Sequence, residues 1–468
     1  MHFLLVAVAL VFGMTSCDEF KSMMDNPVSS YLELKTASVS IVPGGTYQIE
    51  ASSISTAKIT YESSNPDVAI VDPSGKVTAL EDGEATITVR VEANDNYQAG
   101  ATQFQVKVQS PLTLEAKADG VINVNYNGIT LEEPIVYTVF TKEGLKNTVS
   151  ITGTTPIEVK KGDKVQFMSK NDHLATGAWN YVRIEPDMEC AVYGNVMSLI
   201  TPEGDFNTNK TIKKPYAFCR LFYGYILSWE WDTAAEKWIY KYAIVNHDKY
   251  KLVLPATTLS NHCYYYMFSN SGLTEAPELP ATTLANRCYG YMFNSCRNLT
   301  VAPKLPATNL APECYYSMLS YTGITEAPEL KVEDLSNSYG CYYSMFAGCS
   351  ELTKAPKLPA TKLSSQCYAQ MFYDCSKLEE GPVLPASKLV SQCYSNMFAY
   401  CYKLKSLTCQ ATSMTNNATE NWLQGAGANV DLAVECTFTK AASAAWDNTT
   451  TIYGDTNGWN VTNRWTIK

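Results

Sequence analysis

Cysteine is the residue type in this chain with the greatest potential for chemistry. The sequence contains 15 cysteines and 4 histidines, and His262 directly precedes Cys263. Cysteines in such number can form disulfides, bind metal or act as nucleophiles beside a histidine. However, the histidines lie at no metal-ligand spacing, adjacent residues of a helix point apart, and no phosphate-binding loop or Gly-x-Ser-x-Gly motif occurs. We therefore predict that the protein is not an enzyme and has no catalytic residue, metal site or cofactor.

Most of the cysteines belong to an internal repeat. Cys-Tyr pairs are spaced 25, 26, 27, 26 and 26 residues apart, and each is followed four residues on by Met-Phe, or once by Met-Leu. The pairs begin at Cys263, Cys288, Cys314, Cys341, Cys367 and Cys393. A fixed period of this length predicts a solenoid, in which each unit is too small to bury its own apolar face and stacks on its neighbours.

The spacing within one repeat predicts a helix followed by a strand. From Leu284 to Cys296 the apolar residues fall at positions 0, 4, 5, 8, 9 and 12, which is a one-sided helical stripe. The segment 299–305 predicts a short strand, and the Pro-Ala-Thr sequence at 306–308 predicts a turn. Strands would then stack in parallel on the concave side and helices on the convex side.

If the predicted helices form, the repeat cysteines lie in the apolar core as small side chains and do not form disulfides with one another. Equivalent cysteines on neighbouring helices would lie about 8–10 Å apart, whereas a disulfide needs Cα atoms within about 7 Å. We therefore predict free thiols in a continuous core. The argument does not apply to two other pairs, Cys190 with Cys219 and Cys409 with Cys436, which could still form disulfides.

The repeat motif Met-Phe-x2-Cys-x2-Leu, leading into Ala-Pro-x-Leu-Pro-Ala-Thr, resembles the BspA-type leucine-rich repeats of Bacteroides-like surface lipoproteins. The resemblance covers residues 216–409 and implies a curved α/β leucine-rich-repeat solenoid. It also implies that residues 410–468 form a C-terminal cap. Proteins of this type are implied to bind host matrix proteins or other cells.

The N-terminus predicts export and lipidation. An apolar run at 3–12 precedes Thr15-Ser16-Cys17, which resembles a lipobox, and Asp18-Glu19 resembles an acidic surface-export signal. We predict a signal peptide at 1–16, a lipid anchor at Cys17 with a tether over 17–30, and an outer-membrane protein exposed at the cell surface. Its only contact with the membrane would be the lipid anchor.

Two β domains are predicted between the tether and the repeats, so the whole fold class is mixed. Residues 31–110 alternate apolar and polar residues in short runs, and the segments 62–71 and 75–80 resemble bacterial Ig-like domains of group 2. Residues 111–215 predict a second, Ig-like all-β domain; they resemble the region that precedes this repeat type in related lipoproteins, which implies that the domain would seal the N-terminal edge of the solenoid. The insertion 225–250 fits neither the β domains nor the repeat.

Charged residues of the predicted strands are the candidate ligand-binding site. The net charge of −10 and the absence of a basic cluster argue against nucleic acid. Successive strands carry charges that would line the concave face, namely Glu275, Glu278, Lys304, Glu326, Glu329, Lys354, Lys357 and Glu380. We predict that this face binds an extracellular protein of the host matrix or cell surface, or that the charges simply neutralise one another.

The alternative ligand is a glycan. Three tryptophans of the insertion, Trp229, Trp231 and Trp238, are candidates for stacking on sugar rings. The alternative function is therefore a carbohydrate-binding surface lipoprotein.

Overall fold

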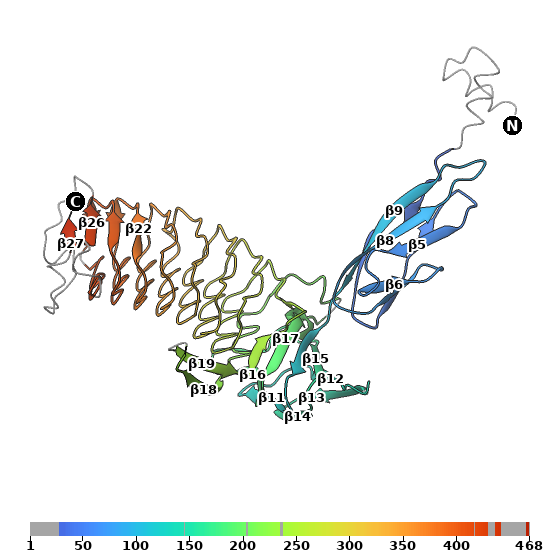
Figure 1. Cartoon of the computed structure of the whole chain (residues 1–468), viewed down its shortest axis with the longest axis horizontal. Helices are drawn as coiled ribbons and strands as arrows, with labels where there is room; N and C mark the ends of the chain where they lie inside the picture. The colour runs from blue at the N-terminus through green and yellow to red at the C-terminus, as the bar shows by residue number, and fades with distance from the viewer. Residues whose placement is uncertain are drawn as a thin grey trace, which may run out of the picture. The chain divides into compact units, whose positions relative to one another are not determined.

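The computed structural model describes residues 28–144, 146–202, 205–234, 237–415, 417–428, 436–440 and 465–467. The chain forms two compact units that divide between Ser110 and Pro111 (Figure 1). Cys17, the signal peptide and most of the tether lie outside the described residues. Among the described residues, no helix is long and apolar enough to cross a membrane.

The first unit is a β-sandwich. Its strands are β1 (Glu33–Leu34), β2 (Ser38–Ile41), β3 (Thr46–Gln48), β4 (Ala51–Ser52), β5 (Ile59–Ser63), β6 (Ala69–Val71), β7 (Lys76–Ala79), β8 (Gly83–Val91) and β9 (Gly100–Val108). One sheet has the order β2-β9-β8-β5, a second has the order β3-β7-β6, and β1 pairs with β4. Alternate residues of the long strands, such as Ile87 and Val89 on β8 and Phe104 and Val106 on β9, are buried between the sheets.

The second unit begins with two more sheets. Its first strands are β10 (Leu112–Ala116), β11 (Gly120–Asn127), β12 (Ile135–Phe140), β13 (Lys146–Ile151), β14 (Thr155–Val159), β15 (Lys164–Ser169), β16 (Tyr181–Pro186) and β17 (Cys190–Asn195). The larger sheet has the order β13-β12-β15-β10-β17-β20, and the smaller has the order β14-β11-β16. A 3-10 helix, η1 (Val196–Leu199), follows β17.

The repeats continue from this sheet without a break in packing. Strands β20 (Ile244–Asn246) and β21 (Leu252–Val253) both pair in parallel with β17. A single apolar core then extends from Leu112 in the sheets to Cys436 beyond the last Cys-Tyr repeat. The predicted boundary at 215/216 therefore divides the sequence pattern but not the core.

The predicted helices are wrong, and with them the α/β leucine-rich-repeat fold. The one helical element among the described residues is η1, and each Cys-Tyr-x2-Met-Phe segment is a series of turns. The backbone is left-handed at every fourth residue, as at His262, Tyr266 and Asn270, with φ of 58°, 56° and 59°. Left-handed φ interrupts a right-handed helix, because an α-helix needs φ near −63° at every residue.

Backbone hydrogen bonds show how these turns stack. Within one turn segment, alternate amides donate to the carbonyl three residues back, as from Met267 to Tyr264 at 3.1 Å. The amides between them donate to the next repeat, as from Tyr264 to Cys288 and from Phe268 to Met292, both at 3.0 Å. Each repeat is therefore one coil of a solenoid, hydrogen-bonded directly to the coils before and after it.

Turn segments of this kind also flank the six Cys-Tyr repeats. The two flanking segments begin at the left-handed residues Tyr216 and Asn417. Those of the six repeats begin at His262, Arg287, Glu313, Gly340, Gln366 and Gln392. In the first segment, Phe218 takes the tyrosine position and stacks on Tyr264 at 5.6 Å. In the last segment, Trp422 stacks on Tyr394 at 6.2 Å and closes the row.

The opposite side of each coil contains little regular strand. In the middle of the array, neighbouring coils pair there through isolated bridges such as Glu275 with Val301 and Lys354 with Glu380. The predicted strand at 299–305 is therefore reduced to a single bridging residue, Val301. Regular strands form later, at β22 (Glu380–Leu384), β23 (Lys388–Leu389), β24 (Ser406–Cys409), β25 (Ser413–Met414), β26 (Cys436–Lys440) and β27 (Trp465–Ile467).

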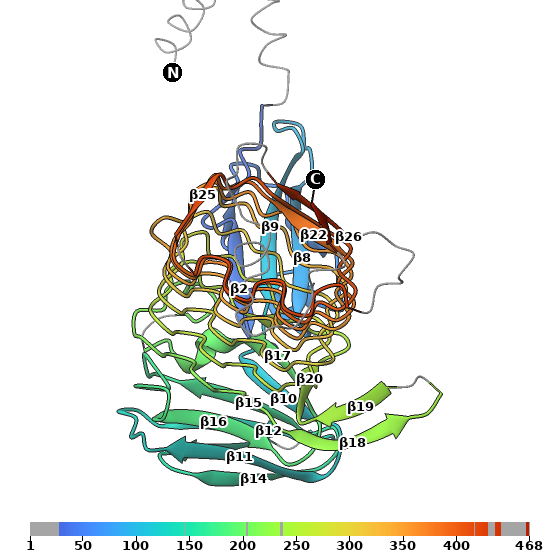
Figure 2. The same cartoon turned by 90° about the vertical axis from the view of Figure 1, so that its left-hand side faces the viewer.

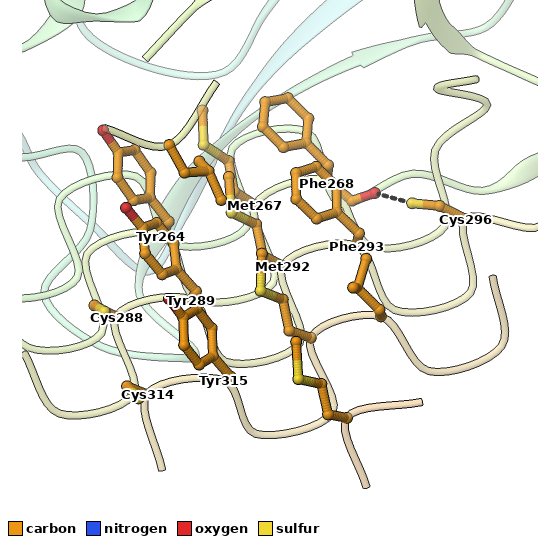
Figure 3. Close-up of a cluster of buried hydrophobic side chains, with 14 of the residues drawn as sticks. Tyr264, Met267, Phe268, Cys288, Tyr289, Met292, Phe293, Cys296, Cys314 and Tyr315 are labelled. Carbon is orange, nitrogen blue, oxygen red and sulfur yellow. Dashed lines mark hydrogen bonds between the residues drawn. The ribbon is translucent and has the colours of Figure 1, made fainter. Parts of the chain in front are cut away.

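Equivalent side chains of successive coils lie in rows inside the solenoid. Figure 3 shows Tyr264, Tyr289 and Tyr315 stacked in one row and Met267 and Met292 in another. The tyrosine rings are 5.8 and 5.9 Å apart and within 9° of parallel. These side chains are fully buried, so that truncating one of them to alanine is expected to cost about 3–5 kcal/mol.

Replacing Gly340 with Ala tests the turn structure. Gly340 is a left-handed residue with φ of 56°, and an added Cβ would lie 3.3 Å from the Glu313 side chain and 3.9 Å from the Tyr343 Cβ. We expect Gly340→Ala to lower the free energy of unfolding by about 1 kcal/mol in urea denaturation, because left-handed φ disfavours a Cβ. A helix would give the opposite sign, a stabilisation of about 1 kcal/mol.

Gly177→Ala is the matched control for this measurement. Gly177 is not left-handed, and no atom lies within 4 Å of the place that an added Cβ would take. We expect little change in stability for this variant.

Candidate functional site

The repeat cysteines are chemically silent in the folded protein. All fourteen cysteines that the structure describes are free and buried. Burial raises the pKa of Cys288 to about 12 and that of Cys296 to about 11. Because the thiolate is the form that attacks or binds metal, these thiols have little reactivity near neutral pH.

The structure agrees with the prediction of free thiols, but the predicted spacing is wrong. Neighbouring coils are joined by direct backbone hydrogen bonds and do not stand at the 8–10 Å separation of packed helices. Cys288 and Cys314 lie side by side in one row, and neither side chain is turned toward the other (Figure 3). The four cysteines left open by the sequence, Cys190, Cys219, Cys409 and Cys436, are also free.

A second row of cysteines has a structural role. The Cys296 thiol donates a hydrogen bond to the Phe268 carbonyl at 3.0 Å, and Cys375 donates to Phe346 in the same way at 3.1 Å. Two other coils place Ser271 and Thr322 at this position. The position therefore takes a small side chain that can donate a hydrogen bond to a buried carbonyl.

The three histidines that the structure describes form no nucleophilic or metal-binding cluster. The His262 ring stacks on Tyr216 at 4.5 Å, and Cys263 is completely buried beside it. His247 lies 3.2 Å from a carboxylate oxygen of Glu115. Within the described part of the chain, no group of three or more His, Cys, Asp or Glu side chains could hold a metal ion.

The predicted ligand-binding charges all lie on one wall of the coils. We call this the Pro wall and define it by segments 275–281, 301–307, 326–330, 354–360 and 380–386. All eight predicted charged side chains are exposed on it, while its leucines, such as Leu279 and Leu305, are buried. Outward charges therefore alternate with inward apolar residues along each segment.

Ion pairs neutralise only part of the Pro wall. Glu275 is paired with Lys251 at 2.9 Å, Lys354 with Glu380 at 3.0 Å and Glu329 with Lys331 at 3.2 Å. Among the described residues, Glu278, Glu326, Lys304 and Lys357 have no ion-pair partner.

The Pro wall also contains a shallow hollow between two coils. This hollow, of about 490 Å³, lies between segments 300–306 and 325–331, and Lys304, Glu326 and Glu329 line it. Charges of both signs are therefore available around a recess that is open to solvent.

The insertion that the sequence left unplaced is a β-hairpin. Strands β18 (Ile226–Asp232) and β19 (Lys237–Tyr242) pair with each other and with no other strand of the described chain (Figure 2). Trp229, Trp231 and Trp238 are 64%, 50% and 50% exposed on it. The structure thus places the three predicted tryptophans together on this hairpin.

A row of half-buried tyrosines was not predicted as a separate surface. Tyr266 stacks on Tyr291 at 4.4 Å, Tyr291 lies 5.2 Å from Tyr316, and Tyr316 stacks on Tyr343 at 4.6 Å. These residues follow the Cys-Tyr pair by one or two positions in their repeats, which is the sequence signal that could have revealed them.

The family comparison identifies the first unit. Residues 31–101 match the family described as bacterial Ig-like domain (group 2). These residues are a bacterial Ig-like domain. The sandwich of this Ig-like domain continues in the structure to the end of β9 at Val108. Comparison with curated proteins finds no match to the chain.

Alkaline pH is expected to destabilise the second unit. Burial raises the pKa of Cys190, Cys219, Cys288, Cys393 and Cys409 from a reference of 9.0 to about 12. The folded state therefore keeps protons that the unfolded state releases, so this stabilisation is complete below pH 9 and is lost as pH rises toward 12. We expect the unfolding midpoint, measured by calorimetry under reducing conditions, to fall steadily between pH 9 and pH 10.5.

The Ig-like domain is the internal control, because it contains no cysteine. Its own transition should shift less over the same range. An unchanged midpoint for the second unit would contradict the assignment of buried, neutral thiols.

Proposed function

We propose that this protein is a non-enzymatic cell-surface lipoprotein that binds an extracellular protein through the Pro wall. The observation that carries the proposal is the exposure of charged side chains in equivalent positions of five consecutive coils. Stacked repeats form a long, continuous surface, which is the usual binding surface of solenoid proteins.

The charge pattern suits a protein ligand. Lys304 and Lys357 alternate along the wall with Glu278 and Glu329, so a partner with the complementary order of charges would be selected. Such complementarity contributes mainly to the rate and specificity of association. The half-buried tyrosine row adds a second surface of a type that is common at protein interfaces.

The identity of the partner class rests on the sequence. The repeat motif resembles that of BspA-type surface lipoproteins, which supports a host matrix protein or host cell surface as the ligand. In this proposal the signal peptide directs export, the lipid on Cys17 anchors the chain in the outer membrane, and the Ig-like domain acts as a spacer.

Charge reversal on the Pro wall tests this proposal. Lys304 and Lys357 have no ion-pair partner among the described residues, so reversing them breaks no ion pair there. We expect Lys304→Glu combined with Lys357→Glu to weaken binding to a matrix protein at least tenfold, in biolayer interferometry against fibronectin, laminin and collagen.

Lys388→Glu is the matched control. Lys388 is an exposed lysine of the same solenoid, outside the Pro wall, and it also has no ion-pair partner among the described residues. Equal binding by the double variant and the control would move the site away from the Pro wall, and failure to bind any matrix protein would refute adhesion.

Replacing Cys17 with Ala tests the anchor. Without the acylated cysteine, we expect most of the protein to move from the membrane fraction to the soluble fraction, because the lipid is its only predicted membrane anchor. Immunoblots of fractionated cells measure this shift, and protease treatment of intact cells reports surface exposure. Unchanged fractionation of Cys17→Ala would exclude lipidation.

A further inference from the structure

A second candidate site lies between the β18–β19 hairpin and the coils. The structure has a groove there of about 880 Å³. Hairpin and coil residues both contribute to it, among them Trp231, Trp238, Tyr240, Arg297, Tyr321 and Lys377. None of the eight charged residues of the Pro wall lines it, whereas Thr300 and Thr325 line both this groove and the hollow of the Pro wall.

The hairpin supplies an aromatic wall. Trp231 pairs directly with Trp238 across the hairpin, and Trp229 pairs with Tyr240. Directly paired residues of antiparallel strands point to the same side, so these four rings share one face of the hairpin. The Trp231 and Trp238 rings meet edge to face with their centres 5.4 Å apart, and half of each side chain remains exposed.

Contacts with one coil hold this wall in place. The Arg297 guanidinium lies 5.2 Å from the centre of the Tyr240 ring, and the Asn298 side chain donates a hydrogen bond to the Tyr240 carbonyl at 3.4 Å. The aromatic face is therefore positioned beside the coils by contacts that do not use the tryptophans themselves.

The floor of the groove contains another exposed ring. Tyr321 is 42% exposed, and its ring crosses onto the next coil at Gly348. A Cβ at position 348 would lie only 2.4 Å from the ring, so the ring can occupy this place only because the residue is glycine. The result is a flat aromatic platform that faces solvent.

The groove has a positive charge that no neighbouring carboxylate compensates. Lys377 is paired with Glu351 at 2.7 Å, so these two charges cancel. Arg297 has no carboxylate partner among the described residues, and it is an exposed residue that lines the groove. This local charge is opposite to the net charge of −10 of the chain.

We infer that this groove binds an oligosaccharide that contains an acidic sugar. Exposed aromatic rings offer flat apolar surfaces for the C–H faces of sugar rings, and the threonine and serine hydroxyls of the coil edges can bond sugar hydroxyls. Arg297 is suited to a sugar carboxylate, since guanidinium and carboxylate form paired, charge-assisted hydrogen bonds. This inference goes beyond the protein-binding function of the Pro wall and does not depend on it.

Calorimetric titration of the full chain with defined oligosaccharides tests the inference. The panel contains oligogalacturonate, hyaluronan fragments and sialyllactose as acidic ligands, and cello- and malto-oligosaccharides as neutral ones. We expect at least one acidic ligand to bind, and its affinity to fall at least tenfold in Trp231→Ala and in Trp238→Ala. Arg297→Gln should remove the preference for acidic over neutral sugars.

Trp179→Ala is the matched control, because Trp179 is a 77% exposed tryptophan outside the groove. This variant should bind as the unchanged protein does, and thermal unfolding should show that all four variants are folded.

If none of the acidic ligands binds, or if binding survives both tryptophan substitutions, the inference is wrong. Equal affinity for neutral and acidic ligands would overturn the role of Arg297. Loss of glycan binding with intact binding to matrix protein would leave the Pro wall proposal standing.

Discussion

The backbone hydrogen bond between neighbouring coils is the interaction on which the second unit depends. Along each turn segment, every second amide donates to the next coil, while the amides between them close turns within their own coil. Together the two sets provide partners for backbone groups that would otherwise be buried unpaired. The bonds also fix the distance between coils, so equivalent residues are forced into contact.

This spacing explains the composition of the core. Flat rings stack well at the separation it imposes, as the tyrosine row and the parallel row from Phe222 through Phe268 to Phe293 show. Small side chains are needed where the turns are tightest; cysteine or threonine donates there to a buried carbonyl, and Ser271 lies within hydrogen-bond distance of the Cys296 thiol. The abundance of cysteine therefore reflects packing and hydrogen bonding, and the raised pKa of the thiols is a consequence of the same burial.

The two candidate surfaces arise from opposite properties of the array. The Pro wall is regular, so any side chain exposed in one coil has a counterpart in the next, and charges accumulate there in rows. The groove depends on irregularity, because the hairpin interrupts the repeat and then returns through β20 to the sheet. Placing it beside the coils gives a recess with aromatic and cationic groups that the repeat alone could not provide.

The sequence by itself determined the Ig-like domain, the repeat period and the residues that are buried in each coil. These follow from alternation and periodicity, which depend only on which side chains avoid water. It did not determine the backbone between the buried residues, because apolar pairs four residues apart fit both a helix and a series of four-residue turns. The choice was made by hydrogen bonds to neighbouring coils, which hold residues such as Tyr266 and Tyr291 in left-handed φ at a local cost of about 1–2 kcal/mol each. The same reason applies to the groove: Trp231 and Tyr321 are 90 residues apart in the sequence, and only the tertiary structure brings the hairpin to the edge of the coils.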